Sequence, residues 1–125
     1  MRTTRPAAAR QRTATEALGE LGTSLREHEL LSIQCAHGHH LGAVYETAAG
    51  LVVRTLTGPH SHGSKDRLDA PHHAAARGAV LADLLVTPAG PADDVPAWCD
   101  CGPRLLSRAT LTSEIRRGRR TVHLA

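Results

Sequence analysis

All three cysteines of the 125-residue chain fall in two short segments that also carry residues able to bind metal or bend the backbone. Cys35 is followed by a histidine-rich run that includes His39, and Cys99 and Cys101 flank a single residue. Zinc in structural sites takes four thiolate or imidazole ligands in a tetrahedron, and ligands a few residues apart can reach one ion from a tight turn. The two segments together predict a Cys3His zinc site formed by Cys35, His39, Cys99 and Cys101.

Two histidines compete for the imidazole position of this site. His39 gives a Cys-x3-His spacing in which Gly38 permits a sharp turn, and His37 gives a Cys-x-His spacing that mirrors the Cys-x-Cys pair. We favour His39, because an imidazole at the exit of the turn stands at the start of the next strand. His37 stays open as the alternative.

A structural metal would compensate for a composition that is poor in large apolar side chains. One Trp, one Tyr and no Phe leave Leu, Val and Ala to form the interior. Closing the loop of roughly 60 residues between His39 and Cys99 costs about 3–4 kcal/mol. Structural zinc contributes an apparent ~10–16 kcal/mol near neutral pH in small peptides. The ion can therefore close the loop with a surplus, and we expect it to be structural.

The arrangement resembles the broad class of zinc ribbons and treble clefs. The resemblance rests on the Cys35/His39 pair, on the hairpin expected after it, and on the segment 99–102 followed by a helix. In such proteins the metal is structural, and many of them bind nucleic acid or other proteins. The resemblance therefore implies a zinc-stabilised binding module.

Other chemistry at the same residues has less support. A catalytic zinc needs an open coordination position, and three engaged cysteines leave no obvious room for one. A disulfide across one residue, between Cys99 and Cys101, would be strained. Cys35 as a nucleophile has no evident orienting partner, and an HNH-type nuclease motif would lack its Asn, which is absent from the chain. We expect a protein without enzymatic activity, with a zinc-dependent enzyme as an alternative.

A second histidine-rich patch lies in the segment 57–78, which loses all hydrophobic periodicity and reads as a loop. Its histidines are His60, His62, His72 and His73. Histidines in exposed loops are usually solvated. The functional alternative is a labile second metal site, which would make the chain a metal-responsive protein.

Basic residues concentrate at both ends of the chain, whose formal net charge is +3. Residues 1–15 carry four arginines and no acid, and residues 101–125 carry six arginines and one acid. Arginines on one face of a C-terminal helix can contact phosphates, with an affinity that falls steeply as salt rises. The expected nucleic-acid contacts are Arg108, Arg116, Arg117, Arg119 and Arg120.

The elements that position these groups follow from short-range patterns. Thr13 and Glu16 have capping-box spacing ahead of a helix over 14–27, and Ser107 caps a helix that ends near Gly118. Val, Tyr and Thr enrichment predicts strands, and the expected strands are 30–34, 41–46, 51–56, 80–86 and 119–124. The segment 88–98 is expected to be a loop, and the segment 80–86 also suits a helix.

These patterns predict an α+β fold in one small zinc-stabilised domain. The expected parts are a disordered basic arm over 1–12 and a zinc-binding domain over 13–125 with a β-hairpin, a C-terminal helix–strand unit and the histidine-rich loop. No apolar run reaches the length of a membrane span, and the start of the chain lacks a secretory signal. We therefore expect a cytoplasmic protein that binds nucleic acid or a protein partner in a regulatory role.

Overall fold

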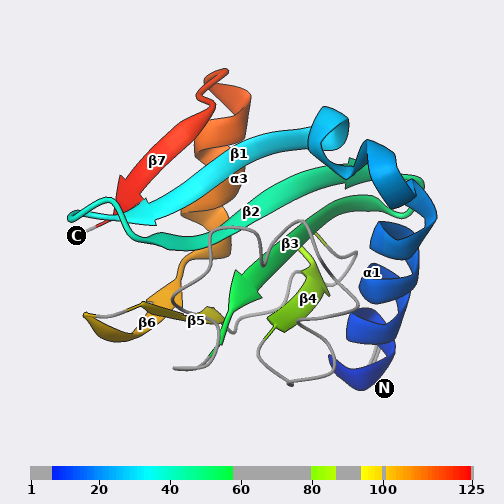
Figure 1. The fold of residues 1–125 in the computed structure, drawn as a ribbon, viewed down its shortest axis with the longest axis horizontal. Coiled ribbons are helices and arrows are strands. Elements are labelled where there is room, and N and C mark those ends of the chain that lie inside the picture. Colours follow the sequence, from blue (N-terminus) through cyan, green and yellow to red (C-terminus); the bar gives the residue numbers. More distant parts are fainter. Residues whose placement is uncertain (1–6, 58–79, 87–93, 100, 125) are drawn as a thin grey trace.

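A computed structural model of the chain describes residues 7–57, 80–86, 94–99 and 101–124. The fold is mixed α+β, with most of the described elements in two sheets (Figure 1). The elements, in chain order, are α1 (Ala7–Leu21), the 3-10 helix η1 (Gly22–His28), β1 (Glu29–Cys35), β2 (His40–Thr47), β3 (Gly50–Leu56), β4 (Val80–Leu84), β5 (Val95–Cys99), β6 (Gly102–Leu106), α3 (Arg108–Arg116) and β7 (Thr121–Leu124).

The larger sheet has five strands in the order β4-β3-β2-β1-β7. Neighbours are antiparallel from β4 to β1, and β7 joins β1 in parallel, with Ser32 opposite Thr121. The predicted hairpin over β2 and β3 is confirmed, and the strand expected over 80–86 is present as β4. Alternating burial along β1 agrees with a period of two residues, since side chains of a strand point to opposite faces in turn.

The smaller sheet is a hairpin of β5 and β6, which the sequence analysis did not predict. The expectation of a loop over 88–98 is wrong for its last residues, because Val95–Cys99 pairs with Gly102–Leu106. The signal was hidden by Pro96 and Pro103, since proline removes a donor from a strand ladder. Both prolines are exposed.

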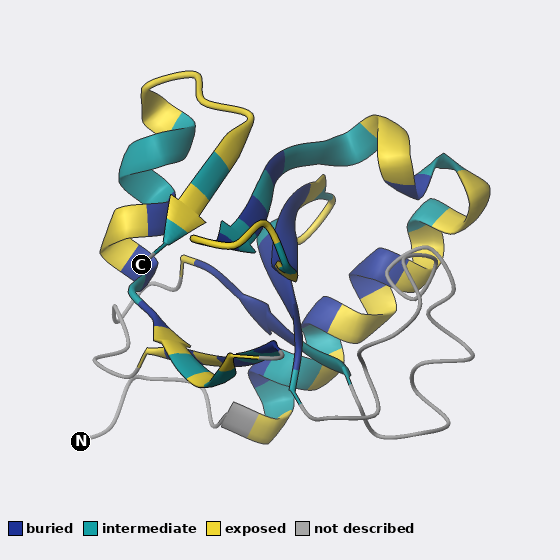
Figure 2. Cartoon of the chain, turned by 60° about the vertical axis from the view of Figure 1, so that its left-hand side comes forward, coloured by how far each residue is buried: buried dark blue, intermediate teal, exposed yellow. Residues whose placement is uncertain are grey.

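Each face of the five-stranded sheet covers its own apolar core, and the buried residues gather around the central strands (Figure 2). The helix-side core joins α1 and η1 to the sheet, with Leu18, Leu25, Tyr45, Val52 and Leu84 among its members. The hairpin-side core joins the other face to β5, β6 and α3, with Ile33, Leu41, Val95, Leu106 and Leu111 among its members. The hydroxyl of Thr55 on β3 also donates to the carbonyl of Pro96 on β5, at 2.8 Å.

The N-terminal helix differs from its prediction. It begins at Ala7, so residues 7–12 of the expected disordered arm are helical, and residues 1–6 lie outside the described part. Arg10 explains the extension, because its guanidinium is buried and binds both carboxylate oxygens of Asp83 on β4, at 3.2 and 3.3 Å. Such a tertiary contact has no signature in local composition.

The C-terminal helix–strand unit forms as predicted. The hydroxyl of Ser107 accepts a hydrogen bond from the backbone N–H of Thr110, at 3.2 Å, which satisfies one of the unpaired donors at the start of α3. Leu111 is fully buried in the hairpin-side core. The chain then turns and returns as β7, which lies beside β1. Among the described helices none has the length and apolarity needed to cross a membrane.

Candidate metal centre

The fold brings the two cysteine-bearing turns together at one end of the hairpin-side core. Cys35 is the last residue of β1, and Cys99 is the last residue of β5. Both belong to the hairpin-side core and are fully buried. None of the three cysteines forms a disulfide. The packing of β5 against the five-stranded sheet is therefore what closes the long gap between the two turns.

The first turn, Cys35–His39, connects β1 to β2. The N–H of Cys35 donates to the carbonyl of His39, and the N–H of Gly38 donates to the carbonyl of Cys35, both at 2.9 Å. Gly38 has a φ of +83°, a conformation that side chains with a Cβ rarely adopt. The N–H of His37 donates to the Cys35 sulfur at 3.3 Å. This turn thus folds backbone donors around a thiol.

The second turn, Cys99–Gly102, connects β5 to β6. Cys99 lies opposite Gly102 in the β5–β6 ladder. Gly102 has a φ of +112°. The N–H of Cys101 donates to the Cys99 sulfur at 3.4 Å, which repeats the bond from the N–H two residues after Cys35. Both turns therefore offer a sulfur that a backbone N–H already faces.

The predicted ligands form one cluster. One donor atom from each of Cys35, His39, Cys99 and Cys101 lies within 4.8 Å of all the others. Nδ1 of His39 is 3.4 Å from the Cys35 sulfur and 3.8 Å from the Cys101 sulfur. Zinc–sulfur and zinc–nitrogen bond lengths in a tetrahedron place such ligand atoms about 3.6 Å apart. The cluster thus fits a metal ion of that size.

We call Cys35, His39, Cys99 and Cys101 the metal cluster. Its members differ in how far they are buried. The thiols of Cys35 and Cys99 are inside the protein, whereas His39 is half-buried and Cys101 is exposed. A metal held here would have two ligands from the core and two from the surface. Such an ion would sit at the rim of the fold and fasten the two turns to each other.

The backbone around the thiols favours a thiolate at Cys35. Burial raises its pKa, but hydrogen bonds from His39, His37 and the neighbouring thiols together outweigh burial and lower the pKa to about 6 from an ordinary 9.0. Desolvation and the adjacent Cys99 and Cys35 sulfurs raise the pKa of Cys101 above its ordinary value. Three sulfurs this close cannot all be negative without a compensating charge, and a bound divalent cation would supply it.

His37 lies beside the cluster and does not belong to it. Its Nδ1 is 3.4 Å from the Cys101 sulfur, and its ring centroid is 6.2 Å from that of His39. His37 is exposed, and it is absent from the set in which every donor lies within 4.8 Å of the rest. His39 therefore belongs to the group that could hold a metal ion, and His37 is a neighbour of one of its sulfurs.

The arginines expected to contact nucleic acid separate into two groups. Arg108 is buried, and its guanidinium donates to Asp83 at 3.0 Å and to the carbonyl of Leu84 at 2.7 Å. It is therefore a core residue and not part of the expected surface. The others are exposed and follow one another where α3 ends and β7 begins. This basic turn consists of Arg116, Arg117, Arg119 and Arg120.

Other predicted features lie outside the described residues. The histidine-rich loop, with His60, His62, His72 and His73, falls in the segment 58–79, for which the structure offers no description.

Comparisons of the chain with models of protein families, with curated proteins and with solved structures returned no match. The chemistry of the site therefore rests on its own geometry.

Proposed function

We propose that the metal cluster binds one zinc ion that holds the fold together, and that the protein is a non-enzymatic module for binding nucleic acid. The observation that carries the first half is the convergence of four donor atoms within 4.8 Å from two turns far apart in sequence. Three thiolates and one imidazole form a ligand set typical of structural zinc. Softer thiolate ligands also disfavour magnesium and calcium, which take oxygen ligands.

The donor count supports a structural role for the ion. Catalytic zinc keeps one coordination position open for water, with three ligands from the protein. Here four donor atoms from the chain lie within 4.8 Å of one another, which supports a full set of four protein ligands. Two of them, Cys35 and Cys99, are fully buried in an apolar core. A zinc in this position would contribute to stability without carrying a reactive water.

The basic turn supports the second half of the proposal. Its four arginines lie within five consecutive residues and are all exposed. Arg117 is 3.6 Å from the carboxylate of Glu114, with 63% of the arginine side chain accessible, so this ion pair leaves it open to a phosphate. Arginine guanidinium groups match phosphate oxygens and contribute a contact that is independent of base sequence.

Elemental analysis tests the metal. The wild-type protein, purified and dialysed, should carry one zinc per chain, and Cys35→Ser and Cys99→Ser variants should carry much less. His40→Ala is a matched control, because His40 is an exposed neighbour of the first turn that does not belong to the cluster. A wild type that takes up no zinc on reconstitution, or Cys variants that keep it, would refute the assignment.

Fluorescence anisotropy with a labelled DNA duplex tests the binding function. Log affinity should fall with log salt, with a slope of about −0.9 for each phosphate neutralised. Replacing Arg119 and Arg120 with Ala should make the slope shallower by about 2. Replacing Arg12, an exposed arginine on α1, should change the slope by less than 1. A duplex that does not bind at low salt, or an equal effect from Arg12→Ala, would overturn this function.

A further inference from the structure

The three sulfurs of the metal cluster differ in their access to solvent. Cys35 and Cys99 are fully buried in the hairpin-side core, whereas Cys101 is exposed. Oxidants in solution react first with a sulfur that is both ionised and accessible. A thiol that binds zinc has lost its proton, so all three sulfurs would be thiolates in the zinc-loaded protein. Access to solvent then makes Cys101 the first sulfur that an oxidant meets.

Backbone hydrogen bonds separate the same sulfurs. The N–H of His37 donates to the Cys35 sulfur at 3.3 Å, and the N–H of Cys101 donates to the Cys99 sulfur at 3.4 Å. The Cys101 sulfur is instead contacted by imidazole nitrogens, with Nδ1 of His37 at 3.4 Å and Nδ1 of His39 at 3.8 Å. The backbone therefore covers the two buried sulfurs, and the side of the cluster that carries Cys101 is open to a small polar molecule.

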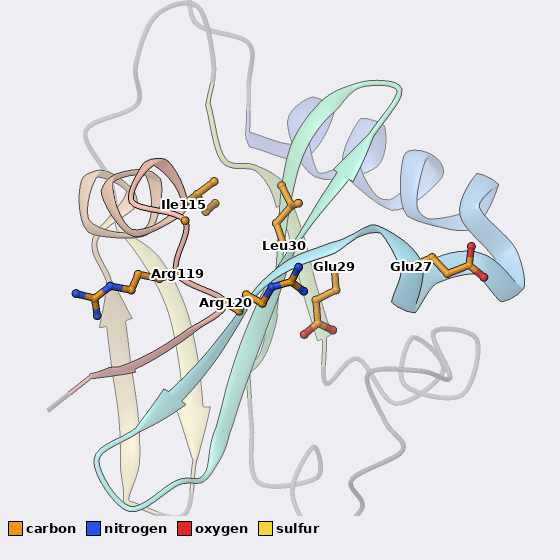
Figure 3. Close-up of a pocket in the computed structure, with 7 residues that line it drawn as sticks. Glu27, Glu29, Leu30, Ile115, Arg119 and Arg120 are labelled. Atoms are coloured by element: carbon orange, nitrogen blue, oxygen red, sulfur yellow. The ribbon is translucent and has the colours of Figure 1, made fainter.

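The exposed sulfur does not belong to the hollow of about 310 Å³ that Figure 3 shows. The described residues that line this hollow include Leu30, near the start of β1, and Ile115, near the end of α3. Cys35 is the last residue of β1, so the cluster stands at the opposite end of this strand. A reagent that needs no enclosing cavity is therefore the one that suits the Cys101 sulfur, and hydrogen peroxide is such a reagent.

A second sulfur within reach decides what an oxidised Cys101 becomes. The sulfurs of Cys35 and Cys101 come from different turns and lie within 4.8 Å of each other. A disulfide brings two sulfurs to about 2.0 Å, and a bond between Cys99 and Cys101 would be strained because it spans a single residue. Sulfurs that respond to oxidants are often placed next to a second cysteine that resolves the first product. Cys35 is therefore the expected partner.

We propose that Cys101 is a site of oxidation by hydrogen peroxide, and that Cys35 then forms a disulfide with it and releases the zinc ion. This inference rests on the proposed zinc site. The Cys101 thiolate attacks one peroxide oxygen, the O–O bond breaks, and the other oxygen leaves as hydroxide, which takes a proton from solvent. The product is a sulfenic acid. The Cys35 thiolate attacks its sulfur, so that the S–S bond forms, the S–O bond breaks and a second hydroxide leaves and is protonated.

The disulfide changes the ligand set but keeps the two turns joined. Two thiolates lose two electrons in total, and one hydrogen peroxide takes up these electrons and two protons to give two water molecules. The ion is left with Cys99 and His39 and dissociates. The new bond connects the turn of Cys35 to the turn of Cys101, so the β5–β6 hairpin stays fastened to the larger sheet. The protein would thus release zinc in response to peroxide, and a thiol reductant would restore the site.

Zinc release and disulfide mapping test the proposal on the full-length, zinc-loaded protein. Hydrogen peroxide should release one zinc per chain to a chromophoric chelator, at a rate that rises with peroxide concentration. Mass spectrometry after alkylation should then find a Cys35–Cys101 disulfide within one chain and a free thiol at Cys99, and dithiothreitol should reverse both changes. Zinc that stays bound would overturn the proposal. A Cys99–Cys101 disulfide, a bond between two chains or sulfinic acid at Cys101 would also overturn it.

Histidine substitutions identify the sulfur that reacts first. Cys101→His keeps four potential zinc ligands and removes the exposed sulfur, so peroxide should release zinc at least about tenfold more slowly. His40→Ala is the matched control and should release zinc at the wild-type rate, because His40 is an exposed neighbour outside the cluster. An unchanged rate in a zinc-loaded Cys101→His variant would refute the choice of sulfur. If that variant takes up no zinc, labelling of the wild type decides the question.

Trapping of the sulfenic acid provides this labelling. Dimedone present during oxidation of the wild type should modify Cys101, and the modified fraction should increase in Cys35→His, which lacks the resolving thiol. Labelling of Cys35 or Cys99 in the wild type would contradict the order of the two steps. The wild-type result stands whether or not the Cys35 variant folds.

Hydrogen exchange tests whether the disulfide replaces the ion. Amides of β5 and β6 should exchange at least about fivefold more slowly in the oxidised, zinc-free protein than in the reduced, zinc-free protein. Equal exchange in the two forms would show that the new bond does not join the turns. A reduced protein that binds no zinc would refute the proposed function, whereas a protein that binds zinc and keeps it in peroxide would refute this inference alone.

Discussion

The four residues of the metal cluster come from two turns that are far apart in the sequence, but each turn arranges its own donor atoms through local features. Each turn places its donors by local means, through a glycine with positive φ and through backbone N–H groups that face the sulfurs. These features follow from residue types and spacing, so the four residues of the cluster could be predicted. Spacing also favoured His39 over His37, but it left His37 open, because both imidazoles lie near the Cys101 sulfur, which arrives from the other side of the fold.

Histidine substitutions distinguish a ligand from a neighbour. His39→Ala removes one of the four donors and should weaken zinc affinity by more than about 100-fold. His37→Ala removes only a contact to the Cys101 sulfur, and outer contacts of this kind change affinity by about tenfold. Competition with a chromophoric chelator measures both. Equal losses in the two variants would show that the imidazole position is shared, and a larger loss for His37→Ala would reverse the assignment.

Zinc affinity should increase with pH, because the ligands must lose their protons to bind. Cys101 has a pKa raised above 9.0 without metal, so at neutral pH zinc must displace its proton. Cys35 has a pKa of about 6, so its proton competes only below about that pH. Apparent affinity should therefore rise by about tenfold per pH unit between pH 7 and 8.5 from Cys101 alone. A flat profile in chelator competition over this range would contradict the raised pKa.

At the scale of elements, one carboxylate joins three parts of the chain. Asp83 on β4 binds Arg10 of α1 and Arg108 of α3, and all three side chains are at most 10% exposed. Its Oδ1 also accepts from the N–H of Leu84 at 2.8 Å. In the sequence, the only signal for the contacts among Arg10, Asp83 and Arg108 was a single charged residue inside the apolar run 80–86. The partners are more than 20 residues away on either side, so their identity required the structure.

Removing this carboxylate should be costly. Asp83→Ala leaves the two buried guanidinium groups without their shared acid, and breaking a buried ion pair from one side costs about 3–5 kcal/mol. Urea unfolding of the zinc-loaded protein should show this loss in the free energy of unfolding. Asp94→Ala changes an exposed acid and should stay within about 0.5 kcal/mol of the wild type. A small effect at Asp83 would mean that water reaches these groups.

We expect the β5–β6 hairpin to be the element that depends most on the proposed zinc ion. A two-stranded hairpin is marginal in water by itself, and its turn supplies Cys99 and Cys101. Chelation of zinc should raise amide hydrogen exchange in β5, β6 and the Cys35–His39 turn by at least tenfold. The β2–β3 ladder and α1, which pack in the helix-side core, should change much less. Restored zinc should reverse the effect, and unchanged exchange in β5 and β6 would show that packing alone holds the hairpin.

At the scale of the whole molecule, two cores share one sheet, and the metal cluster stands at the rim of only one of them. The hairpin over β2 and β3, β4, and the capped C-terminal helix were predictable, because periodicity and capping are local. The missed elements have proline-bearing strands or depend on distant partners, as β5, β6 and the first turns of α1 do.

The central claim is that a single ion, bound by three sulfurs and one nitrogen, joins the two sheets. X-ray absorption at the zinc edge of the reconstituted protein measures that coordination shell directly. We expect three sulfur neighbours at about 2.3 Å and one nitrogen neighbour at about 2.0–2.1 Å. A shell with fewer than three sulfurs, or with zinc bound only by nitrogen and oxygen, would contradict it.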